Sequence, residues 1–203
     1  MLNAETPRLK FAIYGAHSSL GNALLCELLS RQHEAVTLVE DLNSMTVRPG
    51  LRAKTGDLFD AVSVSQSVAG MDAVICLYGS PSLATASGEA AEDQPHCLYQ
   101  AVDSLLSGLP KVGVERLLLV ADISASGEEP EIDAALQRIA AHSLRWTLVD
   151  AEADEEDLSI EDFSVLKGLA SDDRRVRLRR VAAGIVDELE QAQHVHEQIH
   201  FRV

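Results

Sequence analysis

Residues 11–21 read Phe-Ala-Ile-Tyr-Gly-Ala-His-Ser-Ser-Leu-Gly, and this stretch decides the fold. Leu9, Phe11 and Ile13 have the alternating spacing of a buried strand. Leucines with helical spacing follow at positions 20, 24, 25, 28 and 29. Gly15 permits a tight turn between the two patterns, and Gly21 allows the helix and the strand to pack closely. The segment therefore predicts a strand, a glycine turn and a helix in immediate succession.

A turn of this kind holds the pyrophosphate of a dinucleotide in the Rossmann fold, where free N–H groups and the positive end of the helix dipole meet the phosphates. The middle position of the turn, where the backbone approaches the phosphate, is Ser18 in place of a glycine. This substitution adds a side chain that we expect to face the phosphates. It predicts an altered nucleotide site.

The rest of the chain continues the alternation of strands and helices. Strands are expected over residues 35–39, 51–55, 73–77, 116–121 and 145–149 and at the alternating end Ile199, Phe201 and Val203. Helices are expected over residues 60–68, 97–109 and 131–142 and around residues 181–189. Asp60 is a plausible cap of its helix. Repeated strand–helix units predict the α/β class, with a doubly wound parallel sheet in a single Rossmann-type domain spanning residues 1–203.

The composition of the chain excludes some classes of binding partner. A net charge of −15 argues against nucleic acid, because phosphate binding needs Lys and Arg. There is no apolar run of about 18 residues, so we expect no membrane span. Cys26, Cys76 and Cys97 are odd in number and set among apolar residues, which favours reduced, mostly buried thiols in a cytoplasmic protein. The acidic stretch 150–162 and the arginine-rich stretch 174–180 are expected to pair, either within the fold or across the interface of a homo-oligomer.

Short motifs in a fixed order carry a resemblance to a known family. They are Gly15–Gly21, Thr37–Asp41, Gly56–Asp60, Gly70–Ile75, Val112–Leu117, Trp146–Val149 and Val181–Val195. In this order and spacing the chain resembles the atypical short-chain dehydrogenase/reductase proteins. Within them it is similar to the small NAD(P)H-binding type related to flavin and biliverdin reductases and to nitrogen-repressor-like sensors.

The resemblance implies a set of cofactor-binding residues. They are Gly15, Ser18, Ser19, Leu20 and Gly21 for the pyrophosphate, Glu40 for the ribose, Asp57 and Leu58 beside the adenine, and Tyr78 and Gly79 near the second ribose. Polar groups near the nicotinamide would be His17, Asp122 and Ser124, of which Asp122 and Ser124 are the catalytic candidates. His17 is alternatively a solvent-facing turn residue, and Asp122 a cap. Asp57 and Asp60 are alternatively caps of the turn and the helix.

Departures from the family pattern lie around the cofactor. Glu40 stands where the family commonly has an arginine for the 2′-phosphate of NADP, so NAD is expected to be preferred over NADP. Ala121-Asp122 and Asp150-Ala151-Glu152 replace small serines and Arg-Pro-Gly. Acidic side chains near a polyanion lower affinity, so weak binding or its loss is also open.

Catalytic chemistry is sparse in the sequence. The Tyr-x-x-x-Lys pair of the catalytic short-chain dehydrogenases is absent, because Ser18, Ser82 and Asp103 follow the three tyrosines four residues later. Two functions therefore remain open. One is an NAD(H)-binding oxidoreductase that passes hydride to a small acceptor such as a flavin or a quinone. The other is a non-catalytic relative, acting as a nucleotide sensor or a protein-interaction module.

His194, His196 and His200 lie close together near the end of the sequence. No acidic or cysteine ligand joins them in a recognised metal-binding pattern, so we expect an exposed chain end and no metal site.

Overall fold

The computed structural model describes residues 7–42, 48–79, 97–123, 130–151, 158–164 and 174–201. Seven parallel strands form one sheet in the order β3-β2-β1-β4-β5-β6-β7. The strands are β1 (Lys10–Tyr14), β2 (Glu34–Val39), β3 (Leu51–Thr55), β4 (Ala73–Leu77), β5 (Arg116–Ala121), β6 (Arg145–Asp150) and β7 (Glu197–His200). The order changes direction between β1 and β4, so the sheet has the switch point of a Rossmann-type α/β fold.

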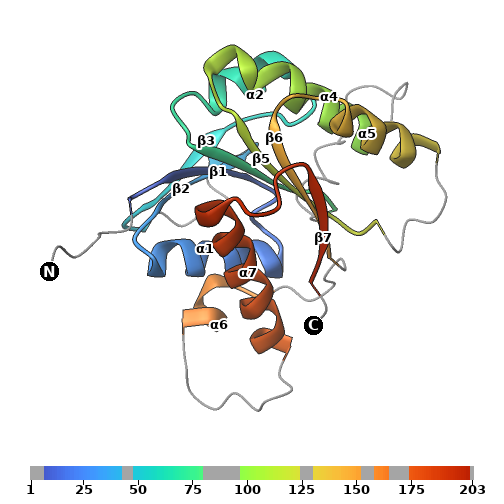
Figure 1. Ribbon diagram of the computed structural model, residues 1–203. Coiled ribbons are helices and arrows are strands. Elements are labelled where there is room, and N and C mark those ends of the chain that lie inside the picture. Colours follow the sequence, from blue (N-terminus) through green and yellow to red (C-terminus); the bar gives the residue numbers. More distant parts are fainter. Residues whose placement is uncertain are drawn as a thin grey trace, which may run out of the picture.

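Helices cover both faces of this sheet (Figure 1). They are α1 (Ser19–Ser30), α2 (Ala61–Ser67), α4 (Leu98–Gly108), α5 (Pro130–Ala140), α6 (Ile160–Ser164) and α7 (Arg174–Gln191), with a 3-10 turn at Pro110–Val112. One layer holds α1, α6 and α7, and the other holds α2, α4 and α5. The predicted doubly wound architecture is confirmed.

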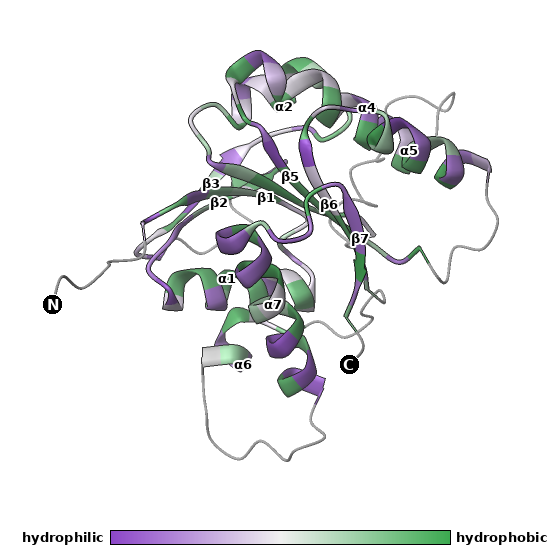
Figure 2. Cartoon of the chain, in the orientation of Figure 1, coloured by the Kyte–Doolittle hydropathy of each residue, from purple (hydrophilic) through white to green (hydrophobic). Residues whose placement is uncertain are grey.

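Each layer packs its apolar side chains onto the sheet. Phe11, Ile13 and Ile75 face α1 and α7, whereas Ala12 and Tyr14 face the opposite layer. Figure 2 shows apolar strands in the interior and helices with polar outer surfaces. The alternation of side chains along β1 thus feeds two separate cores, one on each face.

For most helices and strands, the bounds predicted from the sequence lie close to the observed ones. The bounds of β3, β4 and β5 are as predicted, and Asp60 caps α2 by accepting hydrogen bonds from the N–H groups of Val62 (3.2 Å) and Ser63 (2.9 Å). Helix α6 was not expected, because five residues are too few to show helical periodicity. The closing strand is β7, which ends at His200, earlier than the alternation to Val203 suggested.

The three cysteines are free, but only Cys76 is fully buried, whereas Cys26 and Cys97 are half-buried. Among the described helices, none has the length and apolar character needed to cross a membrane.

A buried ion pair ties α7 to the amino ends of β5 and β6. Arg116 donates to Glu188 (2.8 Å), to the hydroxyl of Thr147 (2.8 Å) and to the backbone oxygen of Arg145 (2.9 Å). Glu188 also accepts hydrogen bonds from the backbone N–H of His194 (3.1 Å) and from its ring Nδ1 (2.7 Å). This network fixes the chain that leads from α7 into β7.

Candidate functional site at the carboxyl edge of the sheet

The turn after β1 has the geometry that the glycines predicted. Gly15 adopts φ 76°, a left-handed conformation that favours glycine. A Cβ on Gly21 would lie 2.5 Å from the carbonyl oxygen of Ala16, so only glycine lets α1 approach the strand end this closely. The first turn of α1 is thereby placed at the switch point, where dinucleotides bind in this type of fold.

Ser18 is the N-cap of α1. Its hydroxyl oxygen accepts a hydrogen bond from the N–H of Gly21 (3.0 Å), and the hydroxyl donates to the carbonyl oxygen of Gly15 (3.2 Å). The side chain that the sequence predicted to face the phosphates thus satisfies an otherwise unpaired helix N–H. Within the described residues the N–H of Leu20 has no acceptor, so it remains available to a ligand.

Segment 158–164 is fastened to this same turn of α1. The hydroxyl of Ser19 accepts a hydrogen bond from the N–H of Leu158 (3.0 Å), and the amide of Asn22 donates to the carbonyl oxygen of Leu158 (2.9 Å). Phe163, which belongs to α6, is fully buried. Sequence reasoning assigned Ser19 to the pyrophosphate, whereas its side chain holds the segment after β6.

The residues expected at the ribose and adenine end lie beyond β2 and β3. Glu40 follows β2 directly, is exposed, and makes no hydrogen bond or ion pair to another residue in the described part of the chain. Asp57 accepts a hydrogen bond from the N–H of Phe59 (2.8 Å), and Leu58 is buried in the core. Asp57 thus caps the turn, as the alternative interpretation had it, and Leu58 presents only its backbone to a ligand.

The residues expected at the nicotinamide end follow β4 and β5. The N–H of Tyr78 donates to the carbonyl oxygen of Val120 (2.8 Å), and Gly79 adopts φ 92° with no described residue within 4 Å of the place a Cβ would take. Asp122 is half-buried directly after β5, and His17 is half-buried in the turn after β1. Ser124 lies outside the described residues.

Asp150 adds a contact at this edge that the sequence did not predict. One of its carboxylate oxygens accepts a hydrogen bond from the N–H of Ile123 (2.9 Å), and the other lies 3.0 Å from Nδ1 of His200. No local pattern in the sequence predicts this pair, because it forms only when β7 aligns in parallel beside β6 with Asp150 opposite His200.

The three histidines near the end of the chain do not converge. His194 bonds to Glu188, Nε2 of His196 bonds to the carbonyl oxygen of Leu144 (2.8 Å), and His200 pairs with Asp150. No group of three potential metal ligands occurs in the described ranges. His196 and His200 are exposed and His194 is half-buried, and each of the three is held by a partner.

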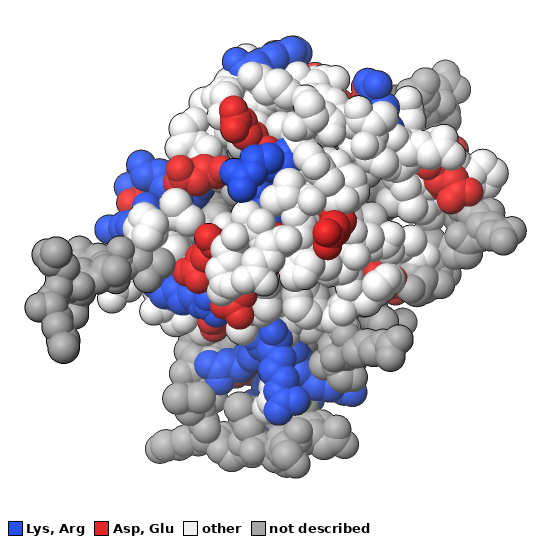
Figure 3. All heavy atoms as spheres, in the orientation of Figure 1, with Lys and Arg blue, Asp and Glu red and all other residues white. Residues whose placement is uncertain are grey.

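The expected pairing of the acidic and arginine-rich stretches is visible within the described residues only as the charge of Arg175 near Asp162. Asp150 pairs with His200 and Glu161 with Arg48, both outside the arginine stretch. Hydrogen bonds from Ser159, together with the nearby charge of Arg175, hold the pKa of Asp162 below its usual range. Residues 152–157 lie outside the described part of the chain. Figure 3 shows Lys and Arg side chains gathered over α7 in the lower part of the visible face.

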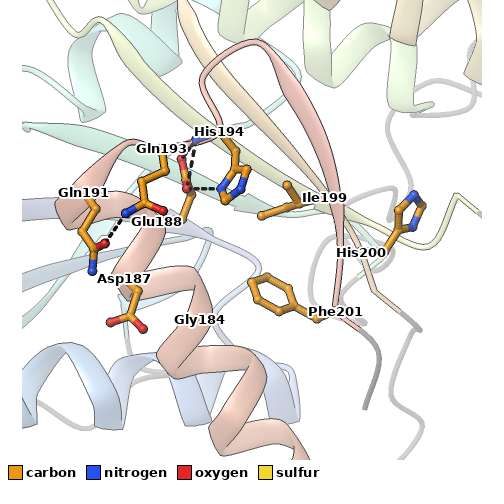
Figure 4. A pocket seen from close by; sticks show the side chains of 9 residues that line it. All are labelled: Gly184, Asp187, Glu188, Gln191, Gln193, His194, Ile199, His200 and Phe201. Carbon is orange, nitrogen blue, oxygen red and sulfur yellow. Dashed lines mark hydrogen bonds and ion pairs between the residues drawn. The ribbon is translucent and has the colours of Figure 1, made fainter.

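A separate cavity of about 360 Å³ lies between α7 and β7 (Figure 4). Its lining residues are Gly184, Asp187, Glu188, Gln191, Gln193, His194, Ile199, His200 and Phe201. Glu188 and His194 are bonded to each other there, and Gln193 donates to Gln191 (2.6 Å). The polar groups of this cavity thus largely satisfy one another, so the carboxyl edge is the stronger candidate site.

The residues at the carboxyl edge fit a dinucleotide. A positive-φ glycine, a close-packed helix start with a free N–H and an exposed carboxylate after β2 occupy the positions that such a ligand requires. The fold and the site therefore define a dinucleotide-binding α/β protein.

Comparison with known proteins identifies the family. A family model described as NAD(P)H-binding matches residues 15–192, and the chain belongs to this NAD(P)H-binding family. No curated protein sequence matches the chain.

Solved structures show the same fold at low identity. A Rossmann-fold NAD(P)-binding family protein from Shigella flexneri is 18% identical over 96% of this chain and 93% of its own, with a TM-score of 0.66. An oxidoreductase from Lactococcus lactis is 16% identical over 95% and 90%, with a TM-score of 0.64. A short-chain dehydrogenase/reductase of the wide type from Veillonella parvula, in complex with NADP, is 13% identical over 96% and 94%, with a TM-score of 0.62.

Proposed function

We propose that the protein binds NAD(H) in preference to NADP(H) and transfers hydride to a small acceptor such as a flavin or a quinone. The observation that carries the preference is the exposed carboxylate of Glu40, directly after β2. A carboxylate at this position accepts hydrogen bonds from ribose hydroxyls and repels a 2′-phosphate. Because Glu40 has no other partner among the described residues, it is free to make these contacts.

Different residues bind different parts of the dinucleotide. The N–H of Leu20 and the positive end of α1 attract the pyrophosphate. Gly79 allows the backbone after β4 to approach the ligand, since its open Cα leaves room where a side chain would stand. The bound nicotinamide supplies the hydride, and Asp122 lies at the end of the neighbouring strand, where it orients the reacting groups.

The tyrosines support a reductase of flavins or quinones over one of ketones. Burial raises the pKa of Tyr14 well above its usual range, and its hydroxyl is bonded to Ser67 (3.1 Å) inside the core. Neither Tyr14 nor Tyr78 is followed four residues later by a lysine that would lower its pKa. A proton relay of the Tyr/Lys type is therefore missing, and we expect no ketone reduction.

A non-catalytic role as a nucleotide sensor or interaction module is the second candidate. It is favoured by the Ser19 and Asn22 contacts to Leu158, which tie the segment after β6 directly to the helix start where the pyrophosphate would bind. In that case dinucleotide binding would change how this segment sits, and no acceptor would be turned over.

Calorimetric titration with NADH, NADPH and FMN tests the proposal. NADH should bind more tightly than NADPH, and Glu40→Arg should raise the affinity for NADPH by about tenfold, which corresponds to about 1.4 kcal/mol. Glu115→Arg is the matched control, because Glu115 is exposed at the opposite, amino end of β5 and makes the same change of charge.

The outcomes separate the alternatives. Tighter binding of NADPH than of NADH by the wild-type protein would contradict the role given to Glu40. Binding of NADH without reduction of any flavin or quinone favours the sensor. Turnover of a secondary alcohol with NAD would contradict the argument from the missing Tyr/Lys pair.

A further inference from the structure

His200 and Asp150 form a pair whose two members differ sharply in exposure. The Asp150 side chain is 6% exposed, whereas the His200 side chain is 57% exposed. Nδ1 of His200 lies 3.0 Å from one oxygen of Asp150, while the second oxygen accepts the N–H of Ile123 at 2.9 Å. The carboxylate is thus fixed from β5 and in turn fixes one nitrogen of an accessible imidazole.

The pair lies at the carboxyl edge of the sheet, beside the residues expected at the nicotinamide end. Ala121 is opposite Asp150, and Asp150 is opposite His200, so the three end neighbouring strands. Two strand spacings of about 4.8 Å place His200 about 10 Å along the edge from the end of β5. One planar acceptor molecule that lies along the edge can span this distance between His200 and the end of β5.

The pair also faces one particular side of the sheet. Side chains at every second position of a strand point to the same face of the sheet. Trp146 and Leu148 therefore share a face with Asp150, and both pack into the core beneath α4 and α5. Figure 4 shows the His200 ring pointing away from the cavity into which Ile199 and Phe201 point. His200 therefore belongs to the carboxyl edge on the α4 and α5 side, and its chemistry is separate from that cavity.

Three other histidines lie at the amino end of the sheet and are used differently. Both ring nitrogens of His33 are engaged, one by the N–H of Leu9 (3.2 Å) and one by Glu190 (2.8 Å). His194 and His196 are held before β7, at the amino end of the sheet. Among the described residues, Nε2 of His200 has no partner, and His200 alone of these four stands at the carboxyl edge.

We propose that His200, positioned by Asp150, donates the proton that accompanies hydride transfer to a quinone-type acceptor at this edge. A carboxylate that fixes one imidazole nitrogen leaves the other free to donate a hydrogen bond and a proton to a bound acceptor. The inference rests on the proposed function and supplies the acid that the missing Tyr/Lys pair leaves unassigned. Asp150 acts as a positioning residue.

The step balances. The quinone takes two electrons and one hydrogen as hydride from NADH, which becomes NAD⁺. Its second hydrogen arrives as the proton on Nε2 of His200, and a new O–H bond forms as that N–H bond breaks. His200 then recovers a proton from water. Reduction of a flavin is different, because hydride addition alone gives the stable reduced anion, and no proton donor is required.

The test compares two acceptors, menadione and FMN, with NADH as donor. His200→Gln keeps a hydrogen-bonding side chain beside Asp150 but cannot act as an acid. It should lower kcat for menadione by about 10²-fold and leave the reduction of FMN within a few-fold of wild type. His196→Gln is the matched control, because His196 is an exposed histidine at the opposite end of β7, and it should change neither rate.

Asp150→Asn separates positioning from folding. The amide still accepts the N–H of Ile123, but the group beside Nδ1 of His200 no longer carries a charge. The value of kcat for menadione should therefore fall while KM for menadione stays within a few-fold of wild type, a split that a purely structural role would not cause. Asp103→Asn is the matched control, because Asp103 pairs with Arg138 at the surface, and it should leave kcat for menadione unchanged.

A spectroscopic measurement provides a readout without turnover. In protein labelled with ¹⁵N-histidine, the Nε2 signal of His200 should shift when NAD⁺ and menadione are added together, while that of His196 should not. If NADH binds but His200→Gln reduces menadione at the wild-type rate, or the Nε2 signal does not move, this proposal is wrong and the proposed function stands. If calorimetry finds no binding of NADH, the proposed function fails and this proposal fails with it.

Discussion

Each end of the sheet has a buried carboxylate, but the partners of the two carboxylates differ in their exposure to solvent. At the amino end, the side chain of Glu188 is 4% exposed and bonded to Arg116 and His194. At the carboxyl end, Asp150 is as deeply buried, but its histidine partner stands half in solvent with one nitrogen open. Glu188 has a charged partner, Arg116, that is itself only 6% exposed, and such a pair holds the fold together. A carboxylate whose partner reaches solvent can take part in chemistry.

The amino-end network shows how such a buried pair is maintained. Burial alone would raise the pKa of Glu188, but hydrogen bonds from His194 and the charge of Arg116 hold it below its usual range. Burial conversely lowers the pKa of Arg116, against the opposing effect of Glu188. The two charges therefore depend on each other, and removing one leaves the other buried without compensation.

The largest effect is expected at this amino end. Glu188→Leu should lower the free energy of unfolding by about 3–5 kcal/mol, since it leaves the Arg116 charge buried and unpaired. Urea denaturation followed by circular dichroism measures the loss. Asp187→Ala on the same helix is the control, because Asp187 pairs with Arg31 at the surface, where such pairs contribute about 0–1 kcal/mol.

The pH dependence checks the same network. Glu188 stabilises the fold fully above its unfolded pKa of 4.5, and this stabilisation is lost as the pH falls through the lower folded pKa. Stability should therefore decline more steeply with acid in the wild-type protein than in Glu188→Leu. Parallel acid profiles would contradict the assignment of the charged pair.

The next effect is expected at the turn of the carboxyl end. Gly21→Ala should destabilise the protein by about 1–3 kcal/mol, although alanine is the better helix former, because its Cβ would meet the backbone of Ala16. Binding of NADH should weaken together with stability. Gly184→Ala in α7 is the comparison, since its Cβ would meet only the ring of Phe201, a side chain near the chain end. An equal loss in both variants would show that backbone contact at Ala16 is not decisive.

The smallest effect is expected at the N-cap of α1. Ser18→Ala should cost about 1 kcal/mol of stability and Ser18→Gly a few tenths, because glycine tolerates the cap position better. Ser18→Gly should also bind NADH more tightly, with slower dissociation, since it frees the N–H of Gly21 and opens the turn. Stopped-flow dissociation kinetics decide this. Weaker binding in Ser18→Gly would mean that the serine hydroxyl itself contacts the phosphate.

The sequence by itself determined what local patterns control. Alternation predicted β1 and the continuous apolar run 73–77 predicted β4, while the glycines at 15 and 21 predicted the turn and the close helix. Asp60 was placed at its cap for the same reason, since a cap depends on residues two or three positions away. These elements, in their order, were enough to predict the fold and the position of the nucleotide turn.

Only the tertiary structure decided which side chains meet. The hydroxyl of Ser19 binds Leu158, 139 residues away, and Arg116 binds Glu188, 72 residues away. The pairing of Asp150 with His200 depends on the register of β7 against β6. A change of that register by one residue would turn His200 to the other face of the sheet, so no local pattern could have revealed this pair.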